Sequence, residues 1–97
     1  MAGKILPLVK IEQPNFPQNS AGQLDMDAVT TDCFFSIGGI TILNTPKNRN
    51  FFFGVCFCSA YYKLQIVVTV QDDYQFYFRL GTASGYGGWK VVDSSFI

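Results

Sequence analysis

Apolar and polar residues alternate along two neighbouring stretches in the second half of the chain. In residues 64–70 leucine, isoleucine and valine occupy every second position, and in residues 74–80 tyrosine, phenylalanine and leucine do the same. A period of two is typical of a β-strand with one face buried. Only Gln-Asp-Asp at 71–73 separates the two stretches. The pattern therefore predicts an antiparallel hairpin with a short tight turn.

The preceding stretch, FFFGVCFCSAYY at 51–62, has no charge and carries six aromatic rings in twelve residues. It is apolar at odd and at even positions, and a strand apolar on both faces is normally covered on both. We expect the larger side chains of the odd positions to face the domain core, namely Phe51, Phe53, Val55 and Phe57. The opposite face is then expected against the N-terminal segment or another subunit, through Phe52, Cys56 and Cys58.

Turn-forming residues recur at short intervals between the remaining apolar runs. Further strands are predicted at 34–43, 51–57 and 89–92, and a single helical turn is the most that 23–31 supports. The sequence predicts an all-β fold, either a small antiparallel β-sandwich or a curled sheet.

Residues 1–24 contain three of the four prolines and have the composition of an extended segment without its own core. We expect an N-terminal arm over 1–24 and a β domain over 25–97. Leu6 and Leu8 are too apolar for a purely solvated tail and are candidate contacts with a partner. The five residues 5–9 between two lysines are too short for the apolar core of a secretory signal.

The composition limits the classes of function. Lysine plus arginine equals aspartate plus glutamate at 7 each, so no net field would attract nucleic acid or an anionic membrane, and neither is expected as a partner. The apolar run of twelve is shorter than the roughly 20 residues of a spanning helix. Charged residues make up only 14% of the chain, which leaves little polar surface for a small monomer. Some apolar surface is therefore expected to meet another chain.

Catalytic and metal-binding groups are sparse. The chain has no histidine, the commonest general base near neutral pH. Three cysteines without histidine make a poor zinc site, and we interpret them as small buried apolar side chains. Asp25 and Asp27 are interpreted as residues that cap or solvate a turn. The glycine-rich segment 81–88 lacks the Lys-Ser/Thr of a phosphate-binding loop. The sequence predicts neither an enzyme nor a metal or cofactor site.

Two motifs resemble a known family. They are D-x-D-x-x-x-T-D-C-F-F-S-I at 25–37 and Y-F-R-L-G-T-A-S-G-Y-G-G-W-K-V-V at 77–92. Residues 25–92 are similar in these motifs to the knob-like domains of bacteriophage tail fibres and pyocins. Two positions depart from the family pattern: Cys33 stands where glycine is usual, and Tyr86 replaces the first tryptophan of an aromatic pair.

The resemblance implies a viral structural protein in a fibre, spike or head appendage. It implies a homo-oligomer, with a trimer favoured, which is made in the host cytoplasm and incorporated into the virion. Contact with the host surface is a further role that the resemblance implies. Its arm would bind other virion proteins. The resemblance also singles out Arg79, Tyr86 and Trp89. Arg79 could stack on either ring by a cation–π contact. Alternatively, the rings could bind a cell-surface glycan whose hydroxyls bond Arg79, Gln75 or Asp93.

Overall fold

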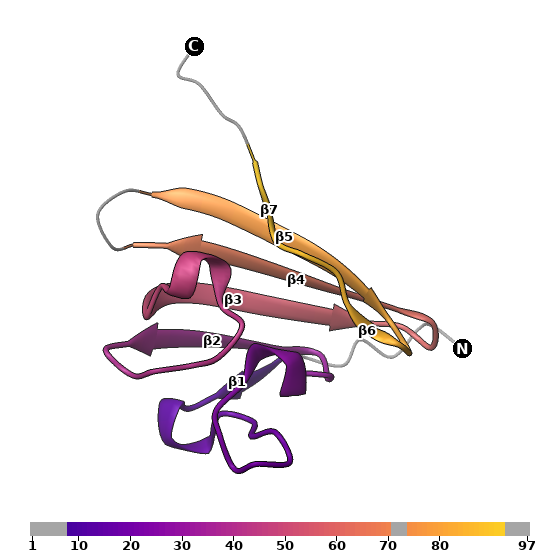
Figure 1. Cartoon of the computed structure of the whole chain (residues 1–97), viewed down its shortest axis with the longest axis horizontal. Helices are drawn as coiled ribbons and strands as arrows, with labels where there is room; N and C mark the ends of the chain where they lie inside the picture. Colours follow the sequence, from indigo (N-terminus) through magenta and orange to yellow (C-terminus); the bar gives the residue numbers. More distant parts are fainter. Residues whose placement is uncertain (1–7, 71–73, 93–97) are drawn as a thin grey trace.

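The described part of the chain forms one β-sheet whose strands lie side by side (Figure 1). The structure is a computed structural model and describes residues 8–70 and 74–92. Its strands are β1 (Val9–Ile11), β2 (Cys33–Gly38), β3 (Phe51–Cys58), β4 (Tyr62–Thr69), β5 (Gln75–Thr82), β6 (Gly85–Tyr86) and β7 (Lys90–Val91). Three single turns of 3-10 helix are η1 (Gln13–Asn15), η2 (Met26–Ala28) and η3 (Pro46–Asn48). The predicted all-β fold is confirmed, and η2 is the one turn expected within 23–31.

The strands follow the order β1-β2-β3-β4-β5, with β6 and β7 both paired to β5. From β2 to β5 each strand is antiparallel to its neighbour, and the predicted hairpin of β4 and β5 is confirmed by the pairing of Leu64 with Leu80. β1 differs from a fully antiparallel sheet because it runs parallel to β2. The two predicted arrangements were a β-sandwich and a curled sheet, and the described residues form a single sheet. β2 ends at Gly38, earlier than predicted, because Gly39 has a φ of 80° and turns the chain away from the sheet.

The core lies on one face of this sheet, which we call the covered face. Loops and 3-10 turns from residues 16–49 pack across it and form what we call the covering layer. Phe35 is central: its ring meets those of Phe16 and Phe52 edge-on, at centroid distances of 5.1 and 6.2 Å. The fully buried apolar residues of this core include Phe16, Met26, Val29, Cys33, Phe35, Ile37, Ile42, Phe52, Cys56 and Val67.

The predicted orientation of β3 is wrong. Phe52 and Cys56 are 1% and 0% exposed and belong to the core, whereas Phe53 is 56% exposed. The reason lies in the neighbouring strands, because the register places Cys56 beside Gln65 and Gln65 beside Arg79 on the covered face. These two polar side chains bond to the covering layer, so their whole face must turn inward. The size of the side chains does not decide the orientation.

The N-terminal segment joins the sheet and the core within the described residues. β1 pairs with β2, and Phe16, from the predicted arm, is 2% exposed in the core. Leu8 is 36% exposed, and the other candidate contact of the arm, Leu6, lies outside the described residues. No helix in the described part of the chain is both long and apolar enough to cross a membrane.

Candidate functional site

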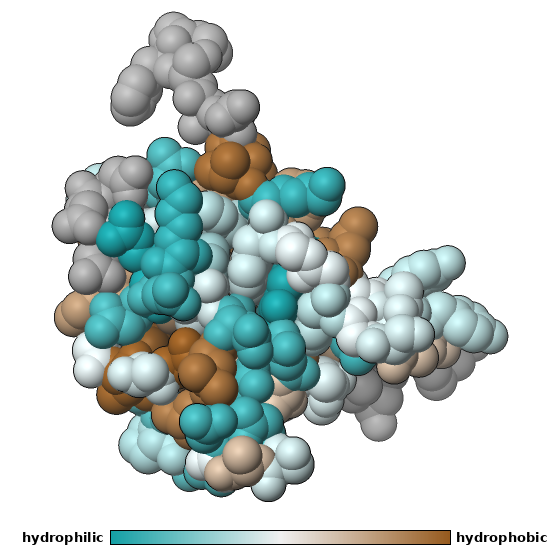
Figure 2. All heavy atoms as spheres, viewed as in Figure 1, coloured by the Kyte–Doolittle hydropathy of each residue, from teal (hydrophilic) through white to brown (hydrophobic). Residues whose placement is uncertain are grey.

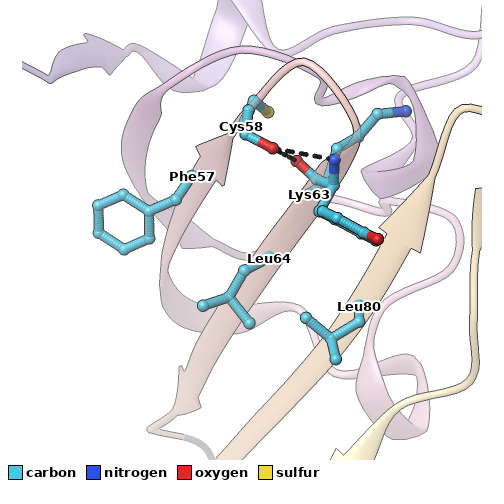
Figure 3. Close-up of a pocket in the computed structure, with 7 residues that line it drawn as sticks. Phe57, Cys58, Lys63, Leu64 and Leu80 are labelled. Carbon is cyan, nitrogen blue, oxygen red and sulfur yellow. Dashed lines mark hydrogen bonds between the residues drawn. The ribbon is translucent and has the colours of Figure 1, made fainter.

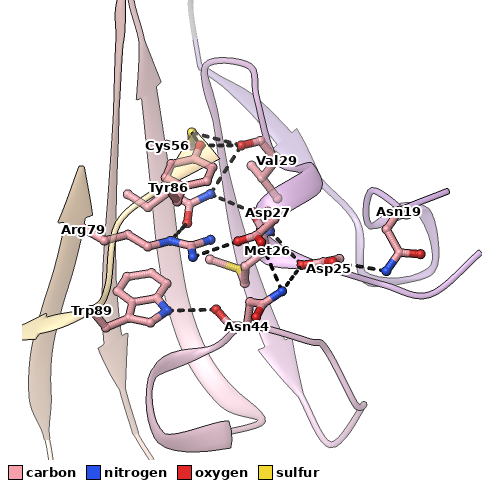
Figure 4. A network of polar contacts seen from close by, with 11 residues as sticks. Asn19, Asp25, Met26, Asp27, Val29, Asn44, Cys56, Arg79, Tyr86 and Trp89 are labelled. Atoms are coloured by element: carbon pink, nitrogen blue, oxygen red, sulfur yellow. Dashed lines mark hydrogen bonds and ion pairs between the residues drawn. The ribbon is translucent and has the colours of Figure 1, made fainter. Parts of the chain in front are cut away.

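Arg79 is the centre of a polar network between the sheet and the covering layer (Figure 4). It is 4% exposed. Its Nε donates a hydrogen bond to Gln65 Oε1 at 2.8 Å, and its Nη1 forms an ion pair with Asp27 Oδ1 at 2.8 Å. Gln65 Nε2 in turn donates to the carbonyl oxygen of Met26 at 2.9 Å. One buried arginine therefore connects β5, β4 and η2.

Two aromatic rings enclose the same guanidinium. Its central carbon lies 4.2 Å from the ring centroid of Tyr86 and 4.6 Å from that of Trp89. The cation–π contact expected for Arg79 is confirmed, and it involves both rings. Each ring is anchored by its polar atom: Tyr86 Oη donates to the carbonyl oxygen of Val29 at 2.7 Å, and Trp89 Nε1 to that of Asn44 at 2.8 Å. The three residues singled out by sequence are thus brought together.

Asp25 organises the edge of the network. Its Oδ1 accepts hydrogen bonds from the backbone N–H of Asp27 at 2.8 Å and from Asn44 Nδ2 at 2.9 Å. Asn19 Nδ2 donates to Oδ2 at 3.1 Å. Burial alone would raise the pKa of Asp25, but these hydrogen bonds outweigh it and hold the pKa below its usual value. The bond from Asp27 caps η2, which confirms the turn-capping interpretation of Asp25.

A polar hollow of about 440 Å³ lies beside this network. Its walls include Asp27, Asn44, Asn48, Arg79, Tyr86 and Trp89. The loop on one side holds Asn44, Lys47 and Asn48 at φ values of 61°, 50° and 55°, a conformation that costs energy for residues other than glycine. A carboxylate, two amides and an aromatic ring are chemically suited to a small ligand with hydroxyl groups.

Gln75 and Asp93 were the other candidate partners of a glycan. Gln75 pairs with Thr69 four residues before Arg79, about 13 Å away along the strand. It therefore lies away from the two rings. Asp93 lies outside the described residues.

The three thiols cluster next to Tyr86, at the border of the Arg79 network. Cys33 pairs with Cys56 across β2 and β3, and Cys56 Sγ lies 3.6 Å from both Cys58 Sγ and Tyr86 Oη. A hydrogen bond from Cys33 is the main influence that lowers the pKa of Cys56, to about 6, whereas burial raises that of Cys58 to about 11. All three are free thiols. Cys33 and Cys56 are buried as predicted, and Cys58, a candidate interface residue, is only partly buried.

The second face of the sheet, which we call the open face, is apolar and exposed. Across β2, β3, β4 and β5 the register aligns Phe34, Val55, Ile66 and Phe78 in one row, and Ser36, Phe53, Val68 and Phe76 in the next. Phe53, Phe76 and Leu80 are 56%, 50% and 59% exposed. Within residues 8–70 and 74–92, no segment covers these side chains. By contrast, the view in Figure 2 shows a side of the molecule on which hydrophilic residues predominate.

Two shallow hollows mark the open face. One, of about 270 Å³, lies between Phe34, Phe53, Val55, Ile66 and Val68. The other, of about 250 Å³, lies where β3 turns into β4, and its walls include Phe57, Leu64 and Leu80 (Figure 3). Both are almost entirely apolar, so they suit apolar side chains better than a polar ligand.

The open face was missed at the level of sequence because its side chains were assigned to the core. Phe52 and Cys56, which were expected against the N-terminal segment or another subunit, are buried inside this chain, in the same core cluster as Phe16 of that segment. No local signal marks the open face, because Gln65 and Arg79 are polar and yet lie on the covered face. Both belong to the less apolar face of their strands, and both are needed as buried partners of main-chain and carboxylate groups.

The chain was compared with protein-family models, with curated proteins and with solved structures, and no match was found in any of the three.

Proposed function

We propose that the chain is a structural subunit of a virion, in a fibre, spike or head appendage, and that it works by packing against other chains. The observation that carries this proposal is the exposed apolar face of the sheet. The resemblance to phage tail-fibre and pyocin knob-like domains supports the kind of particle.

The size of the open face favours a contact surface. A phenylalanine side chain presents about 200 Å² when free, so five half-exposed rings amount to roughly 450 Å² before any aliphatic side chain is counted. The five rings are those of Phe34, Phe51, Phe53, Phe57 and Phe76. The largest apolar patch of an ordinary monomer is about 300–600 Å² and is often functional.

The proposed subunit is a homo-oligomer, with a trimer favoured by the resemblance. It is made in the host cytoplasm and carried in the virion, where its N-terminal segment contacts other virion proteins. Contact with the host surface is part of this proposal. The central polar network has a structural role in this proposal, because the charge of Arg79 is paired with Asp27 and lies between two aromatic rings.

The test is to locate the chain in purified particles by cryo-electron microscopy. Density for the β-sheet, with another chain against its open face, is expected. Particles assembled with Phe53→Glu should lack the subunit, because a charge at the centre of an apolar contact is costly to bury. Tyr61→Glu is the matched control, since Tyr61 is 76% exposed and precedes β4. Absence of the wild-type chain from particles would contradict the proposal.

A second candidate function is recognition of a cell-surface glycan. The observation that favours it is the polar hollow beside Trp89, whose strained loop presents Asn44 and Asn48. Amides and the carboxylate of Asp27 would bond hydroxyl groups, and the exposed part of Trp89 would contact the apolar side of a sugar ring.

Glycan-array binding followed by calorimetry tests this second function. Trp89→Ala should abolish binding, but it also removes a contact of Arg79, so folding must be checked by circular dichroism. Asn48→Gly removes only an exposed amide at a positive φ that glycine adopts freely. It should weaken binding of the glycan found on the array without changing the fold. Thr41→Ala should change neither, because Thr41 is exposed and does not line the hollow. If no glycan binds to the wild-type chain, this function is rejected.

A further inference from the structure

We infer that the occupant of the open face is another copy of the same chain, packed sheet against sheet. The inference rests on the proposed function, in which other chains cover this face, and it names the partner. Four features of the described residues support it: the area of the face, its lack of charge, its short edges and its relief.

The area is what a stable contact between copies requires. Each partner in a standard interface contributes about 800 Å². The five half-exposed phenyl rings supply about half of this. The aliphatic side chains among them supply much of the rest, and they are Val55, Leu64, Ile66, Val68, Val70 and Leu80. A second copy would therefore find an adequate surface without any change in the fold.

The charge pattern permits two copies to approach. The chain has 7 positive and 7 negative residues and no net charge. Along the row through Phe34 and Phe78 the only charged residues are at its two ends, Lys10 on β1 and Lys90 on β7. Their amines can reach water while their stems border the contact. An apolar centre with a charged rim is the usual anatomy of a protein interface.

The edges of the sheet favour contact through the face. β1 has three residues at one edge, and β6 and β7 have two each along the other. Edge strands this short offer few free backbone groups to a strand from another chain. Association by strand addition is therefore disfavoured relative to packing of one sheet face on another.

The relief of the face includes both an exposed ring and a hollow. The hollow of about 270 Å³ beside Val55 and Ile66 is apolar, and Phe53, at its rim, projects into solvent. With a projecting ring and a hollow on the same surface, the Phe53 ring of each copy can enter the hollow of the other copy, as a symmetric contact requires. A phenyl ring fits the apolar character of this hollow better than any polar group.

The width of the face suits either two or three copies. Four strands at about 4.8 Å spacing make β2 to β5 about 19 Å wide, and stacked sheets lie about 10 Å apart. Two copies satisfy this spacing face to face. Three faces of that width around an axis would each lie about 5.5 Å from it, close to half the stacking distance. Both assemblies bury the open face against copies of the chain.

Light scattering of the purified full chain tests the inference. The 10.8 kDa wild-type chain is expected at two or three times its own mass over a micromolar to submillimolar range. Phe53→Glu should weaken association at least tenfold and give a monomer, and Tyr61→Glu should retain the wild-type mass. If circular dichroism shows that Phe53→Glu is unfolded, Phe53→Ala takes its place, with a smaller loss of association.

Two results would overturn the inference: a monomeric wild-type chain throughout this range, or a folded Phe53 variant that associates as the wild type does. The outcomes also separate the inference from the proposed function. A monomer that is nevertheless present in particles rejects self-association, and with it the homo-oligomer of the proposed function, but leaves the structural role in the virion, with a different chain on the open face. A self-associating chain that is absent from particles rejects the virion role and leaves the contact between copies.

Discussion

The ring of Phe35 occupies the space where a side chain at Gly54 would lie. The two residues pair across β2 and β3, and a Cβ on Gly54 would stand 2.7 Å from Cζ of Phe35. Phe35 cannot move aside easily because Phe16 and Phe52 pack against it edge-on. The absence of a side chain at residue 54 therefore lets the central aromatic cluster lie directly on the sheet.

Gly54→Ala is expected to lower the free energy of unfolding by about 1–3 kcal/mol, since the added methyl group overpacks the core. Urea denaturation measures the change. Gly88→Ala is the control, because a Cβ there meets nothing within 4 Å, and its effect should stay within about 0.5 kcal/mol. Equal stability of Gly54→Ala and the wild type would show that the ring of Phe35 can adopt another position without loss of stability.

Arg79→Met is expected to cost about 3 kcal/mol of stability, the low end for breaking a buried ion pair, because Asp27 is half exposed and can be hydrated again. Stability is lost because the buried Gln65 Oε1 no longer accepts the hydrogen bond that Arg79 Nε donates in the wild type. Urea denaturation again provides the measurement.

The matched control for Arg79 is Lys10→Met, which removes an exposed pair with Glu12 at 3.6 Å. Its effect should stay within about 0.5 kcal/mol. Similar losses for the two variants would mean that the Arg79 network adds no more to stability than a surface ion pair.

Stability should depend on pH through Asp25. Hydrogen bonds lower its pKa in the folded chain, so its contribution is present above the unfolded value of about 3.9 and is lost as pH falls through the lower folded pKa. Asp25→Asn should therefore be less stable than the wild type at pH 7, and the difference should shrink below about pH 4. Urea titrations at several pH values measure it, and a difference that is constant with pH would contradict this account.

The thiols should react in a fixed order. Cys58 is the only partly exposed thiol, and burial raises its pKa to about 11, so alkylation should be slow at pH 7 and accelerate as pH rises. Cys56 has a pKa lowered to about 6 but is 0% exposed, so it should react only on unfolding. Mass spectrometry after iodoacetamide treatment distinguishes them. Labelling of Cys56 before Cys58 in the folded chain would contradict the burial of Cys56.

The central strands and the pairing of β4 with β5 could be predicted because they follow from local patterns. Alternation in 64–70 and 74–80 identified β4 and β5, and the short separation identified their antiparallel pairing. The contact of Arg79 with Tyr86 and Trp89 was expected from the family resemblance, which singled out these three residues.

The orientation of the sheet could not be predicted in this way. Counting apolar residues favours the face with Phe51, Phe53 and Leu80, yet the covered face is the one with Gln65 and Arg79. The orientation of the sheet is decided by the hydrogen bonds that Gln65 donates to the carbonyl groups of Met26 and Val29, more than thirty residues away. Such long-range partners leave no local pattern, so the sequence cannot show which face they occupy.

The hydrogen bond from Tyr86 to Val29 spans 57 residues and closes the covering layer over the sheet. The ion pair of Arg79 with Asp27 and the bond from Trp89 to Asn44 are similarly distant in the chain. All three donors lie within residues 79–89, C-terminal to their partners in the covering layer. The covering layer can therefore be locked only after residues 79–89 have left the ribosome, and this step is expected to be slow because non-local contacts are slow to form.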